Sequence, residues 1–138
     1  MFLESICPGQ VNPQPHAIEA FVWKSIRYII YATGSKVVIY ADPAKLVQIV
    51  SSKTLGNDDQ REMVTAVAGC PRTGRLALAC GTQIGIWQYS DKTKSKQQWH
   101  FDTVIDTGTR VSCLDWGKDG KMPSFGSRTR DLGVDAYP

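Results

Sequence analysis

The chain has 138 residues, which is the size of one ordinary domain of about 100–200 residues. Its 42% hydrophobic, 9% aromatic and 21% charged residues are typical of globular proteins and exclude disordered and collagen-like classes. A net charge of +3 is too small to require nucleic acid or an anionic membrane as a partner.

Membrane and export signals are absent from the pattern. The longest uninterrupted apolar stretch, Tyr28–Ala32, is far shorter than the roughly 20 residues of a membrane-spanning helix. The first residues lack the basic region and apolar core of a secretory signal. No CxxC pair occurs, so we expect reduced thiols, mostly used in packing, at Cys7, Cys70, Cys80 and Cys113. The expected location is cytoplasmic, with no direct membrane insertion.

The strongest feature of the sequence is an internal repeat. Ile30–Tyr40 aligns with Ala77–Trp87 at a constant offset of 47 residues, with glycine on glycine and an aromatic residue on an aromatic residue. Each copy is typical of a β-hairpin with a tight turn at Gly34 or Gly81, because glycine readily adopts the positive φ that such turns need. The two hairpins are therefore interpreted as equivalent units.

In chain order, each unit is expected to contain four short strands. The predicted strands are 17–22, 26–32, 36–41, 45–50, 63–69, 75–80, 83–89, 97–105 and 110–116. We expect every pairing to be antiparallel and no helix of ten or more residues within 26–116. A third unit begins with the last of these strands, and its turn residue Gly120 follows 46 residues after Gly74.

Four strands in each period predict an all-β fold, a partial WD-type β-propeller with two four-stranded antiparallel blades plus the first strand of a third. The period is close to the roughly 40–45 residues of a WD blade, whereas the double glycine of the rival kelch blade is missing. The predicted domain organisation is a lead-in at 1–16, the partial propeller at 17–122 and a disordered tail at 123–138. The repeat pattern breaks after Met122, since 124–134 does not read as a strand pair.

The blade signature is degenerate. The terminal Trp-Asp of a standard WD blade is Trp87-Gln88 in the second copy and Tyr40-Ala41 in the first. The aspartate that normally bonds back to the inner strands is therefore missing. Blade rigidity is expected to depend more on apolar packing.

The order of several segments resembles the N-terminal region of the DmX-like (rabconnectin) family, whose fungal members are the large subunit of the RAVE complex. The segments that carry the resemblance are Gln10–Pro13, Tyr31–Tyr40, Leu46–Val50, Thr73–Ala79 and Val111–Gly120. Family members are far longer, with further blades and a helical region. By this resemblance the chain is a truncated gene model, an alternative end or a fragment.

The resemblance implies a regulator of vacuolar-type proton-pumping ATPase assembly. Its implied partners are proteins, namely RAVE complex subunits and vacuolar-type ATPase subunits. Through these partners the resemblance also implies a location peripheral to endomembranes. A generic WD-repeat adaptor unrelated to the proton pump is the alternative, because propeller partners are selected by loops rather than by fold. Nucleic acid is not an expected partner.

No catalytic or metal-binding constellation appears in the sequence. The two histidines, His16 and His100, lack ligand spacing to Cys, Asp or Glu, and phosphate-loop and nucleophile motifs are absent. We therefore predict that the protein is not an enzyme and has no cofactor and no metal. One alternative from another class is a small ligand-binding or enzymatic β-domain in which His100, Asp102 and Asp106 form a polar site.

The candidate protein-interaction residues are Trp23 and Lys24, expected in a loop at the propeller face between the first two strands. Three further tryptophans are expected to pack between blades, and two cysteines in apolar strand runs are expected to be buried. These residues are Trp87, Trp99, Trp116, Cys80 and Cys113. Three lysines precede an aromatic residue but are interpreted as a solvated loop: Lys92, Lys94 and Lys96.

Overall fold

The structure is a computed structural model, and it describes residues 12–13, 16–42, 45–56, 63–90, 98–117, 120 and 122–127. Within these residues the protein is all-β. The strands are β1 (Ile18–Trp23), β2 (Ile26–Thr33), β3 (Lys36–Ala41), β4 (Lys45–Ser51), β5 (Val64–Gly69), β6 (Leu76–Cys80), β7 (Gln83–Tyr89), β8 (Trp99–Asp106), β9 (Val111–Trp116) and β10 (Pro123–Ser127). The only helix in the described ranges is a 3₁₀ turn, η1 (Ser52–Leu55), and none is long and apolar enough to cross a bilayer.

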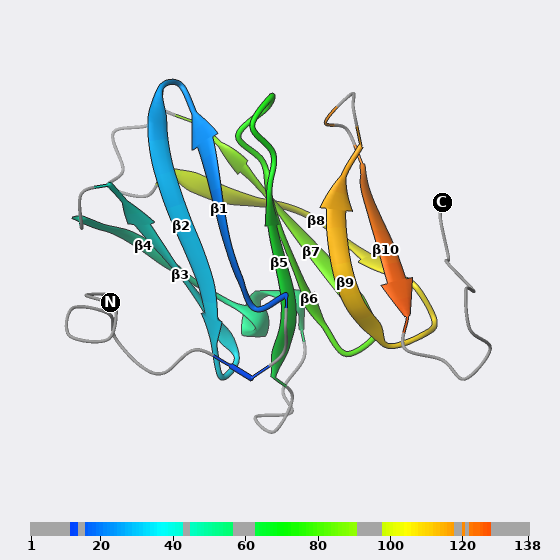
Figure 1. Cartoon of the computed structure of the whole chain (residues 1–138). Helices are drawn as coiled ribbons and strands as arrows, with labels where there is room; N and C mark the ends of the chain where they lie inside the picture. Colours follow the sequence, from blue (N-terminus) through cyan, green and yellow to red (C-terminus); the bar gives the residue numbers. More distant parts are fainter. Residues whose placement is uncertain are drawn as a thin grey trace.

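The strands form three antiparallel sheets (Figure 1). The first sheet has the order β1-β2-β3-β4, the second has the order β5-β6-β7-β8, and β9 pairs with β10. Two four-stranded antiparallel sheets were predicted from the sequence, and this prediction is confirmed. The arrangement is compatible with the blades of a partial propeller.

The third sheet corrects the predicted tail. The sequence assigned only one strand to the third unit and placed 123–138 in the tail, but β10 pairs with β9 along its length, with Phe125 opposite Leu114. Phe125 is 9% exposed and packs against the second sheet. A strand of Pro, Ser and Gly has little β propensity of its own, so it is the pairing and this burial that stabilise it. Residues 128–138 lie outside the described part.

The 47-residue repeat reappears in the bonds between sheets. The amide of Val64 donates to the carbonyl of Gly34 at 2.9 Å, and the amide of Val111 donates to the carbonyl of Gly81, also at 2.9 Å. Donors and acceptors are both 47 residues apart. In each case the first strand of one sheet is bonded to the hairpin turn of the preceding sheet, so equivalent units are joined in an equivalent way.

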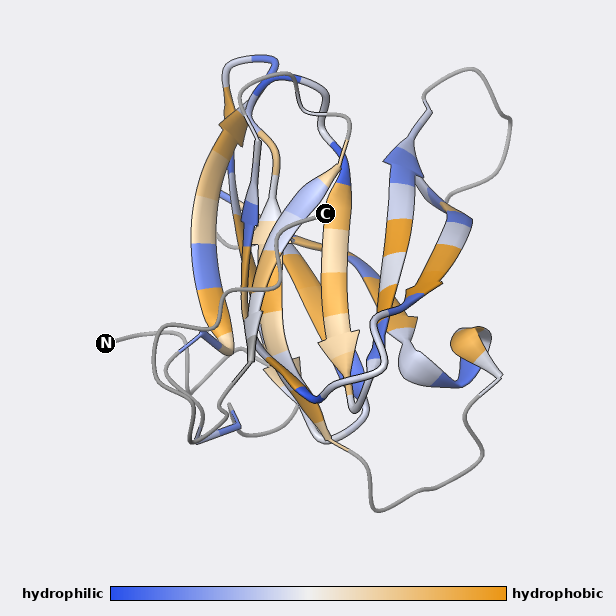
Figure 2. Cartoon of the chain, turned by 90° about the vertical axis from the view of Figure 1, so that its right-hand side faces the viewer, coloured by the Kyte–Doolittle hydropathy of each residue, from blue (hydrophilic) through white to orange (hydrophobic). Residues whose placement is uncertain are grey.

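Two hydrophobic clusters lie between the sheets. The first joins the first and second sheets and includes Ile30, Ile39, Leu78 and Trp99. The second cluster joins the opposite face of the second sheet to β9 and β10. Figure 2 shows hydrophobic residues, coloured orange, along the strands of the facing sheets. The second sheet is thus packed on both faces, and burial of this surface is the main favourable contribution to folding.

The outer strands of the first two sheets are linked through Gln48. Its side-chain oxygen accepts from the amides of Gln98 and Trp99 at 3.0 and 2.9 Å, and its nitrogen donates to the Trp99 carbonyl at 2.8 Å. The side chain is buried. A single amide therefore occupies the bonding positions that a neighbouring strand would use at this point of β8.

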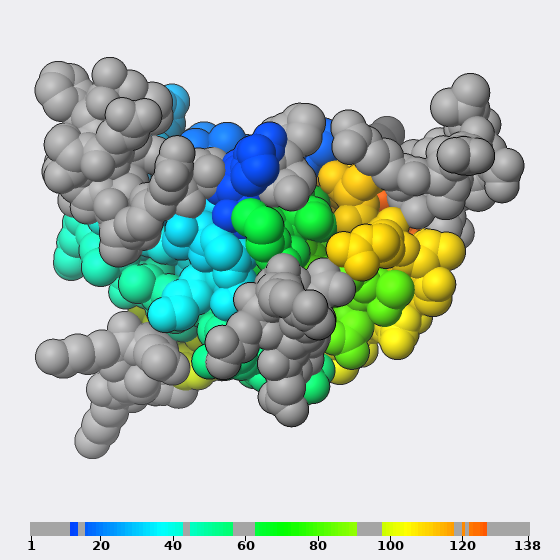
Figure 3. Space-filling view, turned by 90° about the horizontal axis from the view of Figure 1, so that it is seen from below, coloured from blue at the N-terminus to red at the C-terminus, as the bar shows by residue number. Residues whose placement is uncertain are grey.

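Asn12 links the first hairpin to the second sheet at the lower end of the molecule. Its side-chain nitrogen donates to the carbonyls of Gly34 and Val64, both at 2.9 Å, and its oxygen accepts from the Gly34 amide at 2.7 Å. Figure 3 shows blue, cyan and green atoms meeting at this end, which correspond to the N-terminal part, the first hairpin and the start of the second sheet. The satisfied amide fixes these segments in place.

Candidate functional site

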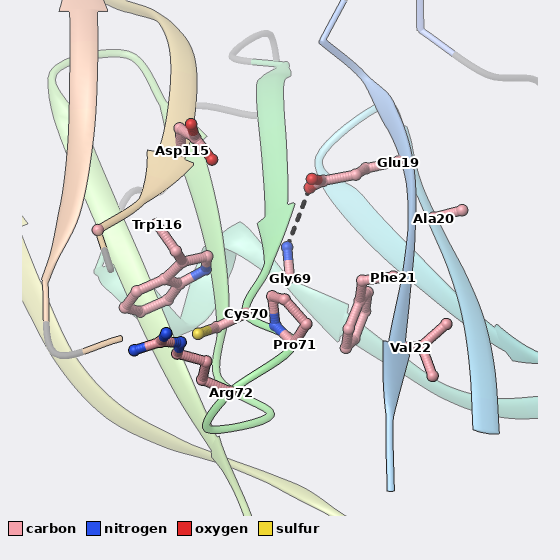
Figure 4. Close-up of a pocket in the computed structure, with 11 residues that line it drawn as sticks. Glu19, Ala20, Phe21, Val22, Gly69, Cys70, Pro71, Arg72, Asp115 and Trp116 are labelled. Atoms are coloured by element: carbon pink, nitrogen blue, oxygen red, sulfur yellow. Dashed lines mark hydrogen bonds between the residues drawn. The ribbon is translucent and has the colours of Figure 1, made fainter. Parts of the chain in front are cut away.

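A groove of about 530 Å³ opens where the first strands of the three sheets lie next to one another. Side chains from β1, from β5 with its following turn and from β9 line it (Figure 4). Its apolar lining includes Phe21 and Trp116, and its charged lining consists of Glu19, Arg72 and Asp115. We call it the junction groove. Concave sites with apolar walls and few charged groups are typical binding sites.

Glu19 is the most perturbed charged group of the junction groove. Its carboxylate accepts a hydrogen bond from the Gly69 amide at 3.0 Å, which orients it between β1 and β5. Burial raises the pKa of Glu19 to about 7, the Gly69 bond opposes this rise, and the negative charge of Asp115 adds to it. Glu19 is therefore a carboxyl group that changes charge near neutral pH.

Trp116 forms one wall of the junction groove. The indole nitrogen donates to the carbonyl of Ala68 at 3.1 Å, so the ring is held against the second sheet. In Figure 4 the guanidinium of Arg72 lies beside this ring, at the end of the groove away from Glu19 and Asp115. The groove thus has two carboxylates toward one end and a cation toward the other.

The structure places Trp23 differently from the sequence prediction. Trp23 is the last residue of β1, half-buried, and its ring packs edge-on against Tyr89 at 6.1 Å between centroids. The expected loop is reduced to Lys24 and Ser25, both at positive φ. A turn this tight leaves Trp23 within the strand, because β1 and β2 pair as far as Trp23 and Ile26.

Lys24 lies beside the same rings. Its Nζ is 5.6 Å from the Trp23 ring centroid and 5.1 Å from the Tyr89 ring centroid, within the range of cation–π attraction. The structure therefore brings the two predicted interaction residues together with Tyr89. Their role in binding a partner stays a prediction.

The alternative polar site does not assemble. His100 lines a second pocket of about 310 Å³ with residues that include Trp87 and Phe101, and neither aspartate lines that pocket. Asp102 and Asp106 are exposed on β8, and Asp106 accepts from the Gly108 amide at 3.0 Å in the turn that follows. The three residues are spread along one strand, and neither of the two described pockets is lined by more than one of them.

The remaining predicted residues are structural or lie outside the described ranges. Trp87, Trp99 and Cys80 are buried, and Cys113 is half-buried. Among the described residues, no group of three or more His, Cys, Asp or Glu side chains could hold a metal ion. The residues outside these ranges are Cys7, Lys92, Lys94 and Lys96.

Sequence reasoning missed the junction groove because its charged residues come from distant strands. The alternation of β1 held one signal, since Glu19 shares a strand face with the core residue Phe21. A carboxylate on a core-facing position is unusual unless it has a partner or a function. Nothing in the sequence placed Asp115 opposite it.

Comparison of this chain with protein-family models and with curated proteins found no match. The class that the fold and groove define is an all-β protein of repeated antiparallel sheets with a groove at the junction of their first strands.

Proposed function

We propose that the protein is a non-catalytic scaffold built from WD-type propeller blades, which binds other proteins through surfaces formed between its sheets. One observation carries the proposal: the bond from the first strand of one sheet to the hairpin turn of the preceding sheet recurs after 47 residues. Repeated sheets joined in this way hold loops and grooves on a rigid frame. The adjacent first strands of the three sheets also support a propeller.

By its resemblance to the DmX-like family, we propose that the longer relative of this chain belongs to a RAVE-type complex and promotes assembly of the vacuolar-type ATPase. The segments quoted for the resemblance include Tyr31–Tyr40, which spans the paired strands β2 and β3, and Thr73–Ala79, which contains most of β6. A generic WD-repeat adaptor is the second candidate. It stands as an alternative because the loops of a propeller, rather than its fold, select its partners.

Affinity capture tests the two candidates. The 138-residue chain and any longer product of the same gene are tagged and captured from lysate under conditions that keep the proton pump intact, with an unrelated tagged β-protein as control. Enrichment of vacuolar-type ATPase or RAVE-type subunits with the longer product supports the pump assignment. Their absence, together with a different reproducible partner, supports the generic adaptor. Enrichment of no protein by either form would overturn the scaffold proposal.

A further inference from the structure

The junction groove brings together three features that rarely coincide on a protein surface. Two carboxylates, Glu19 and Asp115, line it from strands of different sheets. The indole of Trp116 provides an aromatic wall, and Phe21 adds a buried apolar one. The volume of about 530 Å³ admits a long side chain.

We propose that the junction groove binds an arginine side chain from an extended segment of a partner protein. The proposal rests on the proposed function as a protein-binding scaffold and specifies the chemistry of the partner. A guanidinium is planar and donates several hydrogen bonds to carboxylates, so it matches the end of the groove that holds Glu19 and Asp115, while Arg72 lies beside Trp116 at the other end. The extended stem of arginine fits the apolar part of the groove.

The carboxylate of Glu19 is already held in a fixed position in which it can bind a guanidinium. The Gly69 amide already fixes the position of one carboxylate oxygen, so less conformational freedom is lost on binding. The causes that shift the Glu19 pKa are burial, the Gly69 bond and the charge of Asp115, and a cation is not among them. A positive charge placed between the two carboxylates relieves both their repulsion and the burial of Glu19.

Proton binding by Glu19 sets the pH dependence of the affinity for an arginine side chain. The titratable and charged groups that face the groove are Glu19 from β1, Cys70 and Arg72 from the turn after β5, and Asp115 from β9. With a pKa of about 7, Glu19 is mostly protonated at pH 6 and mostly ionised at pH 8. The affinity for a guanidinium therefore rises several-fold from pH 6 to pH 8.

The test is an amide and indole NMR titration of the ¹⁵N-labelled 138-residue chain. The probe is the peptide acetyl-Ala-Arg-Ala-amide, and the matched control replaces arginine by citrulline, which keeps the shape and lacks the charge. We expect saturable shifts of the Gly69 amide and the Trp116 indole with the arginine peptide. The citrulline peptide is expected to bind at least about tenfold more weakly, as is typical when a hydrogen bond loses its charge.

Two variants locate the binding. Glu19→Gln is expected to weaken arginine binding about tenfold and to remove its dependence on pH, and Asp115→Asn to weaken it several-fold. Asp102→Asn removes an exposed carboxylate outside the groove and is expected to leave binding unchanged. If a groove variant fails to fold, the pH series on the unaltered chain still decides the matter.

Equal binding of the arginine and citrulline peptides would overturn the proposal, as would tighter binding of the matching lysine peptide or an unchanged affinity of the arginine peptide for the Glu19→Gln chain. Partner capture separates this result from failure of the scaffold function. If the peptide titrations fail while a captured partner still binds the Glu19→Gln chain, the arginine groove is wrong and the scaffold function stands.

Discussion

The first and second sheets have the same strand order and differ in side-chain size at two of the places where they meet. There the first sheet contributes Phe21 and Trp23, and the second sheet contributes Gly69 and Gly74 opposite these rings. A Cβ added at Gly69 would fall 2.2 Å from the Phe21 ring, and one at Gly74 would fall 2.5 Å from the Trp23 ring. Two sheets with the same strand order can therefore pack through side chains of very different size.

The second sheet also differs because it packs against another described sheet on each of its two faces. Toward β9 and β10 it presents small residues, among them Ala66, Ala68, Ala77 and Ala79. The first sheet has five apolar side chains at 41–49% exposure: Ile18, Val22, Ile26, Leu46 and Ile49. The two sheets thus share a topology, but more large apolar side chains are exposed on the first sheet than on the second.

The largest effect is expected from filling the space that Gly69 leaves. Gly69→Ala places a methyl group against the Phe21 ring, which is itself stacked on Tyr28 at 5.5 Å. We expect a loss of about 3 kcal/mol in the free energy of unfolding, measured by urea titration. The double variant Gly69→Ala with Phe21→Ala is expected to lose less than the sum of the single changes. Strict additivity would show that the two residues do not meet.

The second largest loss of stability is expected when the hydrogen bonds of Gln48 between β4 and β8 are removed. Gln48→Met keeps the length of the side chain and removes its three hydrogen bonds, so the Trp99 amide and carbonyl lose their partner inside the protein. We expect a loss of about 2 kcal/mol in urea unfolding. Gln88→Met, at an exposed position of β7, is the control and should change stability little. A similar loss in both variants would contradict the role of Gln48.

Glu19 gives a smaller effect that depends on pH. Because the folded protein raises its pKa from 4.5 to about 7, the folded state holds the proton more tightly than the unfolded chain. Its contribution to stability is therefore greatest below about pH 4.5, falls as the pH rises to about 7 and is constant above. After allowance for solvent screening of a half-exposed group, Glu19→Gln should gain about 1 kcal/mol at pH 8.

Thermal melting at both ends of this range checks the assignment. Glu19→Gln should melt at a higher temperature than the unaltered chain at pH 8 and at the same temperature at pH 4.5, since the unaltered group is then mostly protonated. Asp102→Asn should show no such difference between the two pH values. An equal gain at both pH values would mean that titration of Glu19 is not the cause.

The smallest effect is expected at Trp23. Its indole nitrogen is buried and has no hydrogen-bond partner among the described residues, so Trp23→Phe loses packing area and also removes an unsatisfied donor. We expect a net change of about 0.5 kcal/mol or less in urea unfolding. Trp99→Phe is the matched comparison, because the indole nitrogen of Trp99 donates to the Gly74 carbonyl at 2.7 Å. That variant should lose clearly more, and equal losses would contradict the difference between the two indoles.

The sequence predicted the sheets well because their strands repeat. Glycine at 34 and 81 and the aromatic residues at 40 and 87 fix the hairpins locally, and such patterns need no knowledge of distant contacts. Strand β10 was missed because Phe125 becomes buried only through pairing with β9. Trp23 was assigned to a loop because the turn made of Lys24 and Ser25 contains no Gly, Asn or Asp, the residues from which such a tight turn is usually predicted.

The junction groove could not have been predicted from the sequence alone. Glu19 and Asp115 lie on β1 and β9, and their interaction depends on how three sheets pack around the first strands. The candidate polar site on β8 was predicted from residues that are close together in the sequence. Residues of an extended strand lie apart along it, and Asp102 and Asp106 are both exposed on β8.

The bonds from Val64 to Gly34 and from Val111 to Gly81 consist of main-chain atoms alone. Every residue except proline carries both of these groups, so the joint between successive sheets survives replacement of the side chains around it. Side chains at equivalent positions of the repeat can then differ, as Ala41 and Gln88 do, while the architecture persists. We expect distant relatives of this chain to share its strand spacing long after they have ceased to share its residues.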